Sequence, residues 1–228
     1  MSEYFFDLAQ AAVSVAGSDR LFPVHRIYCV GRNYAAHARE MGEDPDREPP
    51  FYFMKPADAV VENGATIAYP PRTKKLHYEI ELVVAIGKAG KDIALSRTLE
   101  HVFGYAVGID LTRRDLQDQA KEKRRPWDTG KSFELAAPIT TIHEVDEIGH
   151  PSAGRIWLAV NENIQQDGDI RDMIWDVPET IAELSTLFTL VPGDLIYTGT
   201  PAGVGAVTPG DHITGGIDGV DDIAIEIG

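Results

Sequence analysis

The sequence predicts a mostly β, α+β protein in which short helices cover the strands. Fourteen prolines and 21 glycines divide the 228 residues into short segments, a pattern that is typical of many strands joined by turns. Few segments have the length that the helix of a βαβ crossover needs, so a doubly wound parallel sheet is not expected. A hydrophobic content of 43% is ordinary for a globular protein, and the length suits one well-buried domain.

Several short segments have the composition of strands. They are rich in Ile, Val, Leu or Tyr, and most of them run directly into a glycine or a polar residue. The last one alternates apolar and other residues up to the end of the chain, which is typical of a strand with one buried face. The expected strands are 26–30, 78–86, 105–109, 156–160, 195–197 and 223–227.

Local signals also predict three helices, at 33–41, 112–125 and 178–190. Asn33 can cap the first of them, which ends at a glycine. Thr112 and Asp115 have the spacing of a capping box at the start of the second. Pro178 suits the first turn of the third helix. No repeat or linker divides the chain, so we expect a lead-in segment at 1–22 and a single catalytic domain at 23–228.

Charge and cysteine content exclude several classes of function. A formal net charge of −15 argues against nucleic-acid binding, which needs a basic surface. A small anionic substrate stays compatible if the site itself supplies a metal, Arg or Lys. The single cysteine, Cys29, lies in an apolar run, so we expect a buried thiol with no disulfide and no cysteine-based zinc site. No targeting segment or membrane span is expected, so the protein is expected to be cytoplasmic.

The segment around Glu79 and Glu81 is the most informative part of the sequence. In a strand, side chains alternate between the faces, so His77, Glu79 and Glu81 share one face. The two carboxylates would lie about 7 Å apart and repel each other unless a cation or a proton neutralised them. The alternative is an ordinary solvated strand face that carries two glutamates.

Asp110 strengthens the metal interpretation, although the spacing of these acids matches no defined metal motif. It follows the apolar strand 105–109, where the chain leaves the sheet, and such positions often carry site residues. Two glutamates and one aspartate form an all-oxygen ligand set, which suits Mg²⁺, Mn²⁺ or Ca²⁺ better than zinc. Three protein ligands would leave coordination positions open for water and substrate.

His37 and Glu40 form a candidate pair for activating water. Their i, i+3 spacing places them side by side on the expected helix. A carboxylate beside an imidazole fixes its tautomer and raises its basicity, as general-base catalysis requires. The alternative is a solvated pair on the helix surface.

Cationic residues follow the candidate metal ligands along the chain. Arg114, Gln117 and Lys121 lie on one stripe of the expected second helix, and the first two can face the site of Asp110. The basic run 121–125 is interpreted as a solvated helix end. Lys131 stands between a turn and an apolar segment, where a lysine can donate to a developing oxyanion.

A glycine-rich loop at 198–205 follows the strand 195–197. Glycines let backbone N–H groups approach an anion, so carboxylate binding is the preferred interpretation, against a plain turn. The spacing differs from a dinucleotide-binding fingerprint, and no Gly-x-Ser-x-Gly motif is present, which disfavours an α/β-hydrolase triad.

Together these segments resemble the fumarylacetoacetate hydrolase family, most closely its acylpyruvate and fumarylpyruvate hydrolase branch. The markers occur in order from about Val24 to the end of the chain. They are Val30-Gly31-Arg32-Asn33-Tyr34, His37 with Glu40, Met54-Lys55-Pro56, His77-Tyr78-Glu79-Ile80-Glu81-Leu82, Asp110-Leu111-Thr112-Arg113-Arg114-Asp115 with Gln117, Lys131-Ser132-Phe133, and Thr198-Gly199-Thr200-Pro201.

The resemblance implies a mixed β-roll or sandwich of the family's C-terminal domain type, in a homodimer. It also implies Mg²⁺ or Mn²⁺ held by Glu79, Glu81 and Asp110. His37 and Glu40 would then form the water-activating pair on a short helix that works as a lid.

The implied reaction is metal-dependent hydrolysis of the carbon–carbon bond of an acylpyruvate, with fumarylpyruvate in aromatic-acid catabolism as the first candidate. Lys131 would stabilise the oxyanion. The residues expected to orient this small anionic keto acid are Arg32, Lys55, Arg114, Gln117 and Thr200. Decarboxylation or isomerisation of a related keto acid, such as oxaloacetate, is the alternative. A metal-binding or partner-binding protein without catalysis is a more distant one.

Overall fold

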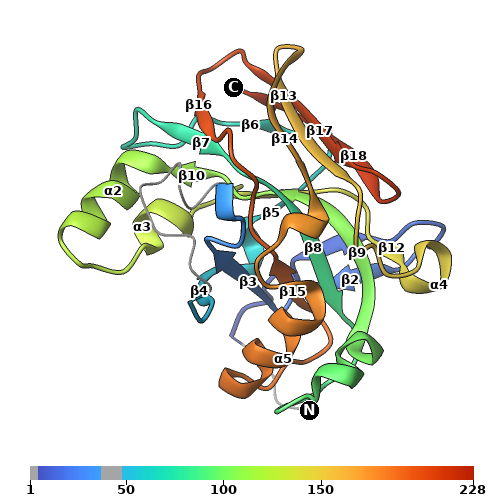
Figure 1. Ribbon diagram of the computed structural model, residues 1–228. Coiled ribbons are helices and arrows are strands. Elements are labelled where there is room, and N and C mark those ends of the chain that lie inside the picture. Colours follow the sequence, from blue (N-terminus) through green and yellow to red (C-terminus); the bar gives the residue numbers. More distant parts are fainter. Residues whose placement is uncertain (1–4, 37–47) are drawn as a thin grey trace.

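The computed structural model describes residues 5–36 and 48–228. Strands dominate it and short helices lie at their edges, which confirms the mostly β, α+β prediction (Figure 1). The strands form sheets of two, three, five and eight strands. Among the described residues, no helix is long and apolar enough to span a membrane.

The eight-stranded sheet forms the centre of the molecule and curves strongly along β8 and β9 (Figure 1). Its strand order is β4-β3-β15-β8-β9-β11-β5, with β12 also paired to β9. Every residue of β8 is buried, because other elements cover both faces of the sheet at this point. The strands are β3 (Arg26–Gly31), β4 (Phe51–Lys55), β5 (Val60–Glu62), β8 (Ile80–Ile86), β9 (Val102–Ile109), β11 (Ala137–Ile139), β12 (His143–Glu144) and β15 (Asp194–Tyr197).

The five-stranded sheet, at the top of Figure 1, packs across β8 and β9 through β13 and β18. Alternate residues of β18 are buried, as the sequence pattern predicted for its segment. The strands of this sheet are β6 (Thr66–Ile67), β13 (Arg155–Val160), β14 (Asn163–Asp169), β17 (His212–Ile217) and β18 (Asp221–Ile227).

The expected strand 78–86 is divided in two, and the break falls at Glu79. The first part, β7 (Leu76–Tyr78), pairs with β10 (Thr112–Arg113) and β16 (Gly205–Val207) in the three-stranded sheet. The second part, β8, pairs with β9 and β15 in the large sheet. Because the two parts belong to different sheets, Glu79 lies at their junction.

The described helices differ in whether a side-chain cap supports their first turn. α5 (Val177–Leu187) has a complete capping box between Asp176 and Glu179, with a proline in its first turn, and it ends before the predicted limit of 190. α2 (Arg114–Glu122) lacks the predicted box, because Asp115 accepts hydrogen bonds from Thr73 and Lys74 instead. The remaining helices are α3 (Asp128–Lys131), α4 (Val145–Ile148) and the 3-10 helices η1 (Ala57–Ala59), η2 (Leu95–His101) and η3 (Ile170–Asp172).

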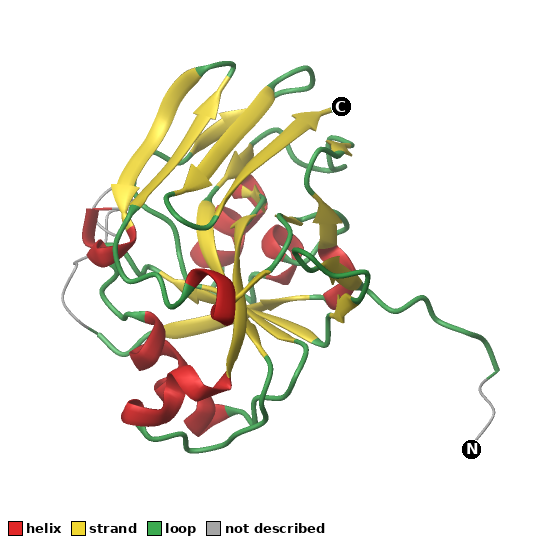
Figure 2. Cartoon of the chain, turned by 90° about the vertical axis from the view of Figure 1, so that its right-hand side faces the viewer, coloured by secondary structure: helices red, strands yellow, loops and turns green. Residues whose placement is uncertain are grey.

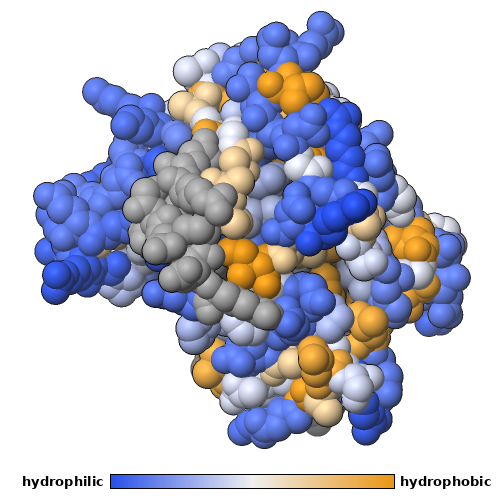
Figure 3. Space-filling view, viewed as in Figure 1, coloured by the Kyte–Doolittle hydropathy of each residue, from blue (hydrophilic) through white to orange (hydrophobic). Residues whose placement is uncertain are grey.

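The N-terminal segment extends away from the body before it joins the fold (Figure 2). Strands β1 (Ala12–Ser14) and β2 (Leu21–Pro23) then pair with each other, and Val13 and Phe22 are buried in the core. The division into a lead-in at 1–22 and a domain at 23–228 stays a prediction, although part of the lead-in packs into the core. The face shown in Figure 3 is mostly hydrophilic, in keeping with the net charge of −15.

Candidate active site

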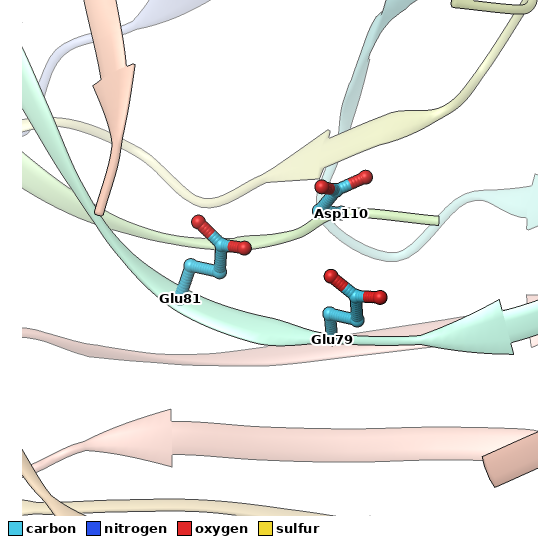
Figure 4. A group of neighbouring side chains, drawn as sticks. All are labelled: Glu79, Glu81 and Asp110. Carbon is cyan, nitrogen blue, oxygen red and sulfur yellow. The ribbon is translucent and has the colours of Figure 1, made fainter. Parts of the chain in front are cut away.

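Glu79, Glu81 and Asp110 point toward one another at the centre of the site (Figure 4). Each offers one carboxylate oxygen, and these atoms lie within 4.8 Å of one another. Glu79 occupies the break before β8, Glu81 is on β8, and Asp110 directly follows β9. Antiparallel pairing of β8 with β9 brings the two segments together, and the Asp110 N–H donates to the Glu79 carbonyl at 2.8 Å.

Burial of these three carboxylates creates the conflict that a divalent cation resolves. All three are nearly inaccessible, and Asp110 is completely so. Burial, followed by the charges of Asp110 and Glu79, raises the pKa of Glu81 well above its ordinary value. Three converging oxygens with no sulfur or imidazole among them fit a hard cation such as Mg²⁺ or Mn²⁺.

Three cationic side chains surround the same cluster. The Lys131 ammonium lies 2.9 Å from a Glu79 oxygen and 2.7 Å from an Asp110 oxygen. The Arg114 guanidinium pairs with the other oxygen of Glu79, and the Lys55 ammonium lies 2.7 Å from the second oxygen of Asp110. The three bases therefore compensate Glu79 and Asp110, and none of these ion pairs reaches Glu81.

Glu81 differs from the other two acids in its partners. Within residues 5–36 and 48–228 it has no ion pair, and it accepts one hydrogen bond from the Gly199 N–H at 2.7 Å. The glycine-rich loop therefore brings a backbone donor to an anion, as the sequence indicated, but that anion is a side chain of the protein itself. Gly199 has φ +96°, and a Cβ there would lie 2.7 Å from the Cβ of Asn33.

Asn33 holds this loop in place, and because the predicted helix lies mostly outside the described residues, its role as a cap stays a prediction. Its side-chain amide donates to the carbonyls of Trp175 and Thr198, both at 2.8 Å, and its side-chain oxygen accepts from the Trp175 N–H. The amide therefore joins the end of β3 to the segment before Gly199. His37 and Glu40, together with the rest of the predicted first helix beyond residue 36, lie outside the described residues.

Lys55 has three partners for its ammonium group. Besides Asp110, it donates to the carbonyls of Leu111 at 3.0 Å and Lys131 at 2.6 Å. An ammonium has three donors, so this arrangement fixes Asp110 and the backbone around it. Direct contact between Lys55 and a substrate stays a prediction.

Arg114 and Gln117 lie one turn apart on α2, as their spacing predicted, and the guanidinium donates to the Gln117 side-chain oxygen. Arg114 also lies 3.4 Å from His77 Nδ1. Burial and then the Arg114 charge lower the pKa of His77 to about 4, so this imidazole is neutral near pH 7. His77 therefore adds no charge to the site near pH 7.

Two polar residues at the site were not predicted. Thr112 was assigned to a helix cap, but its hydroxyl accepts a 2.7 Å hydrogen bond from Lys131. The Gln166 side chain accepts from the Ile80 N–H and donates to the Thr200 hydroxyl and the Pro201 carbonyl. Gln166 lies far from both segments in the sequence, on a different sheet, so no local pattern indicates its role.

A small hollow lies over the carboxylates and collects most of the predicted site residues. The charged and polar residues that line it are Arg32, Glu79, Glu81, Arg114, Gln117, Lys121, Lys131 and Thr200. Asp110 and Lys55 lie beneath this lining, in contact with Lys131.

Comparison with known proteins places this architecture in one family. Residues 26–227 match the fumarylacetoacetate (FAA) hydrolase C-terminal family. The chain is 48% identical to a fumarylpyruvate hydrolase from Ralstonia sp, over 82% of this chain and 98% of that one. It is 41% identical to the mitochondrial oxaloacetate tautomerase FAHD1 of Rattus norvegicus, over 88% of this chain and 90% of that one.

A solved structure has nearly the same fold throughout. The crystal structure of fumarylpyruvate hydrolase from Pseudomonas aeruginosa, in complex with Mn²⁺ and pyruvate, superposes with a TM-score of 0.97. The two chains are 52% identical, and the match covers 99% of each. The protein belongs to the fumarylacetoacetate hydrolase family, as the ordered motifs indicated.

Proposed function

We propose that this protein is a metal-dependent hydrolase that converts fumarylpyruvate into fumarate and pyruvate. The observation that carries the proposal is the buried cluster of Glu79, Glu81 and Asp110, set among three cations in a chain about half identical to fumarylpyruvate hydrolases. The Pseudomonas aeruginosa relative was solved with Mn²⁺ and pyruvate, and pyruvate is one of the two products.

Charge balance supports a dianionic substrate. Glu79, Glu81 and Asp110 would hold the cation, which when bound supplies Lewis-acid polarisation of the keto acid's oxygens. The three acids and the three bases Lys55, Arg114 and Lys131 compensate one another. A divalent cation, together with Arg32 and Lys121 in the lining of the hollow, therefore leaves an excess of positive charge, which suits a substrate with two carboxylates.

His37 and Glu40 are the proposed base and its orienting partner, on the basis of their sequence spacing. His37 takes a proton from water, whose oxygen attacks the carbonyl carbon of the fumaryl group. The bond from that carbon to the neighbouring methylene breaks, and the proton carried by His37 completes the methyl group of pyruvate. Lys131 is proposed to stabilise the oxyanion formed in the attack.

The remaining predicted residues are proposed to orient the substrate. Arg32, Gln117 and Thr200 line the hollow over the carboxylates, where they can reach a bound molecule. Arg114 also lines this hollow and forms an ion pair with Glu79, so its guanidinium can contact both the acid and a bound substrate. Lys55 supports Asp110 from below.

We also propose a homodimer, from the family resemblance, and a role in aromatic-acid catabolism, from the substrate. A cytoplasmic location is proposed from the single cysteine, Cys29, which is a buried free thiol.

The test measures pyruvate release from fumarylpyruvate and from acetylpyruvate with Mg²⁺ or Mn²⁺, and again after EDTA. Metal-dependent release that is fastest from fumarylpyruvate is the expected result. Oxaloacetate serves as the comparison, because the relatives named oxaloacetate tautomerase are about 40% identical. Turnover of oxaloacetate without pyruvate release from either diketo acid would replace the proposal with decarboxylation or isomerisation.

A further inference from the structure

A second and larger hollow, of about 640 Å³, opens beside the one that holds the carboxylates. Its aromatic walls come from Phe51 and Phe53 on β4 and from Trp127 just before α3, and its charged lining residues are Arg32, Arg125, Lys131 and one acid, Asp128. The Trp127 ring meets Phe51 edge-on, with 5.2 Å between centroids, and lies 5.8 Å from Phe53. The volume suits a small organic molecule, and mutual ring contacts hold the walls in place.

The two hollows are adjacent, because they share lining residues. Phe51, Phe53, Trp127, Arg32 and Lys131 line both. The Lys131 ammonium shows the connection directly, since it lies 2.7 Å from Asp110 and 4.9 Å from the centre of the Phe53 ring. A molecule held at the carboxylates can therefore extend along the aromatic walls.

Arg125 belongs to the lining of the larger hollow and not to that of the hollow over the carboxylates. Arg32 lines both hollows, whereas Arg125 lines only the larger one. The Arg125 side chain is exposed and has no ion pair with any residue in the part of the chain that the structure describes. A guanidinium in this state can bind a carboxylate through two parallel hydrogen bonds.

We propose that the larger hollow is the subsite for the acyl arm of the substrate and that Arg125 binds the carboxylate at the end of that arm. The aromatic walls suit a flat, conjugated chain, and the arginine selects a chain that ends in a negative charge. This assignment rests on the proposed function, since it places the keto acid at the carboxylate cluster. It gives Arg125 a role in specificity, where the sequence indicated only a solvated helix end.

The test compares two substrates that differ in this arm. Fumarylpyruvate has a carboxyvinyl arm that ends in a carboxylate, whereas acetylpyruvate has a methyl group in place of that whole arm. We expect Arg125→Gln to lower kcat/KM for fumarylpyruvate by about tenfold or more, the usual loss for a charge-assisted hydrogen bond. For acetylpyruvate the change should be less than about twofold, and Arg125→Lys should restore part of the loss for fumarylpyruvate.

Arg124→Gln is the matched control, because Arg124 is an exposed neighbour that lines neither hollow. It should leave both substrates unchanged. Equal losses for both substrates in Arg125→Gln, or no loss for either, would overturn the subsite while wild-type turnover still supported the hydrolase. A wild-type protein that cleaves neither substrate would overturn the hydrolase and the subsite together.

Discussion

Replacing Glu81 with glutamine should stabilise the metal-free protein while abolishing its ability to hold a metal. Glu81 is buried, has no ion pair among the described residues, and accepts one hydrogen bond from Gly199. Glutamine has almost the same shape and keeps an oxygen for that hydrogen bond. The substitution therefore removes a buried charge that lies close to Asp110 and Glu79, and leaves the packing intact.

The expected gain is on the order of 1–3 kcal/mol, the cost of a buried charge without a compensating partner. For a chain of this length, each kcal/mol moves the unfolding temperature by about 2–4 °C. Thermal unfolding in EDTA should therefore show Glu81→Gln melting several degrees above the wild type. Added Mn²⁺ should raise the unfolding temperature of the wild type and have little effect on the variant.

The stabilisation should also depend on pH in a defined direction. Folding raises the pKa of Glu81 above its ordinary value of 4.5. Below pH 4.5 the Glu81 carboxyl is protonated in both the folded and the unfolded protein, so it does not lower the free energy of unfolding. As the pH rises, the unfolded chain ionises first, so the wild type loses stability until the pH passes the folded pKa. The difference between variant and wild type should therefore grow from acidic to neutral pH.

Asp110→Asn provides the contrast, because Asp110 has two buried cationic partners. Its replacement leaves Lys55 without a charged partner and removes one from Lys131. Loss of one member of a buried ion pair costs about 3–5 kcal/mol, so this variant should be destabilised in EDTA. An unfolding temperature for Glu81→Gln at or below that of the wild type, or a difference that does not change with pH, would refute the electrostatic reasoning.

Three further substitutions test the proposed general base, the buried hydrogen bonds of Gln166 and the cap of α5. His37→Ala should lower kcat by about 10² to 10⁴, the usual contribution of a general base, and a rate close to wild type would remove His37 from the mechanism. Gln166→Leu should lower the free energy of unfolding by about 1–3 kcal/mol in urea, because the Ile80 N–H and the Pro201 carbonyl lose buried partners; an unchanged midpoint would contradict this. Asp176→Ala should cost about 1 kcal/mol in the same assay through loss of the α5 capping box, with kcat/KM unchanged.

The six predicted strand segments and the third helix occur in the structure because their signals are local. Burial of all seven residues of β8 follows from an apolar run that the sequence displays directly. The capping box of α5 lies within four consecutive residues, so its energy depends little on the rest of the fold. The acids Glu79, Glu81 and Asp110 were found for a similar reason, since alternation along a strand and a position at a strand end are both local properties.

Prediction failed where a distant segment offered a polar side chain a better partner. Thr112 and Asp115 have the spacing of a capping box, but Lys131 binds the first and Thr73 with Lys74 binds the second. These hydrogen bonds join segments that are distant in the sequence, so a local pattern cannot predict them. The break at Glu79 has the same origin, because the pairing partners of β7 and β8 belong to different sheets.

The break at Glu79 also explains how one short segment can supply two carboxylates to the candidate metal site. In an uninterrupted strand, the carboxylates of Glu79 and Glu81 would lie about 7 Å apart, too far to share an ion without help. At the junction of two sheets, the chain can turn the Glu79 carboxylate toward Glu81, and both come within 4.8 Å of Asp110. The three-stranded sheet also carries β10 and so leads into α2, which supplies Arg114. The interruption therefore brings the acids together and delivers a cation that pairs with the buried Glu79 carboxylate.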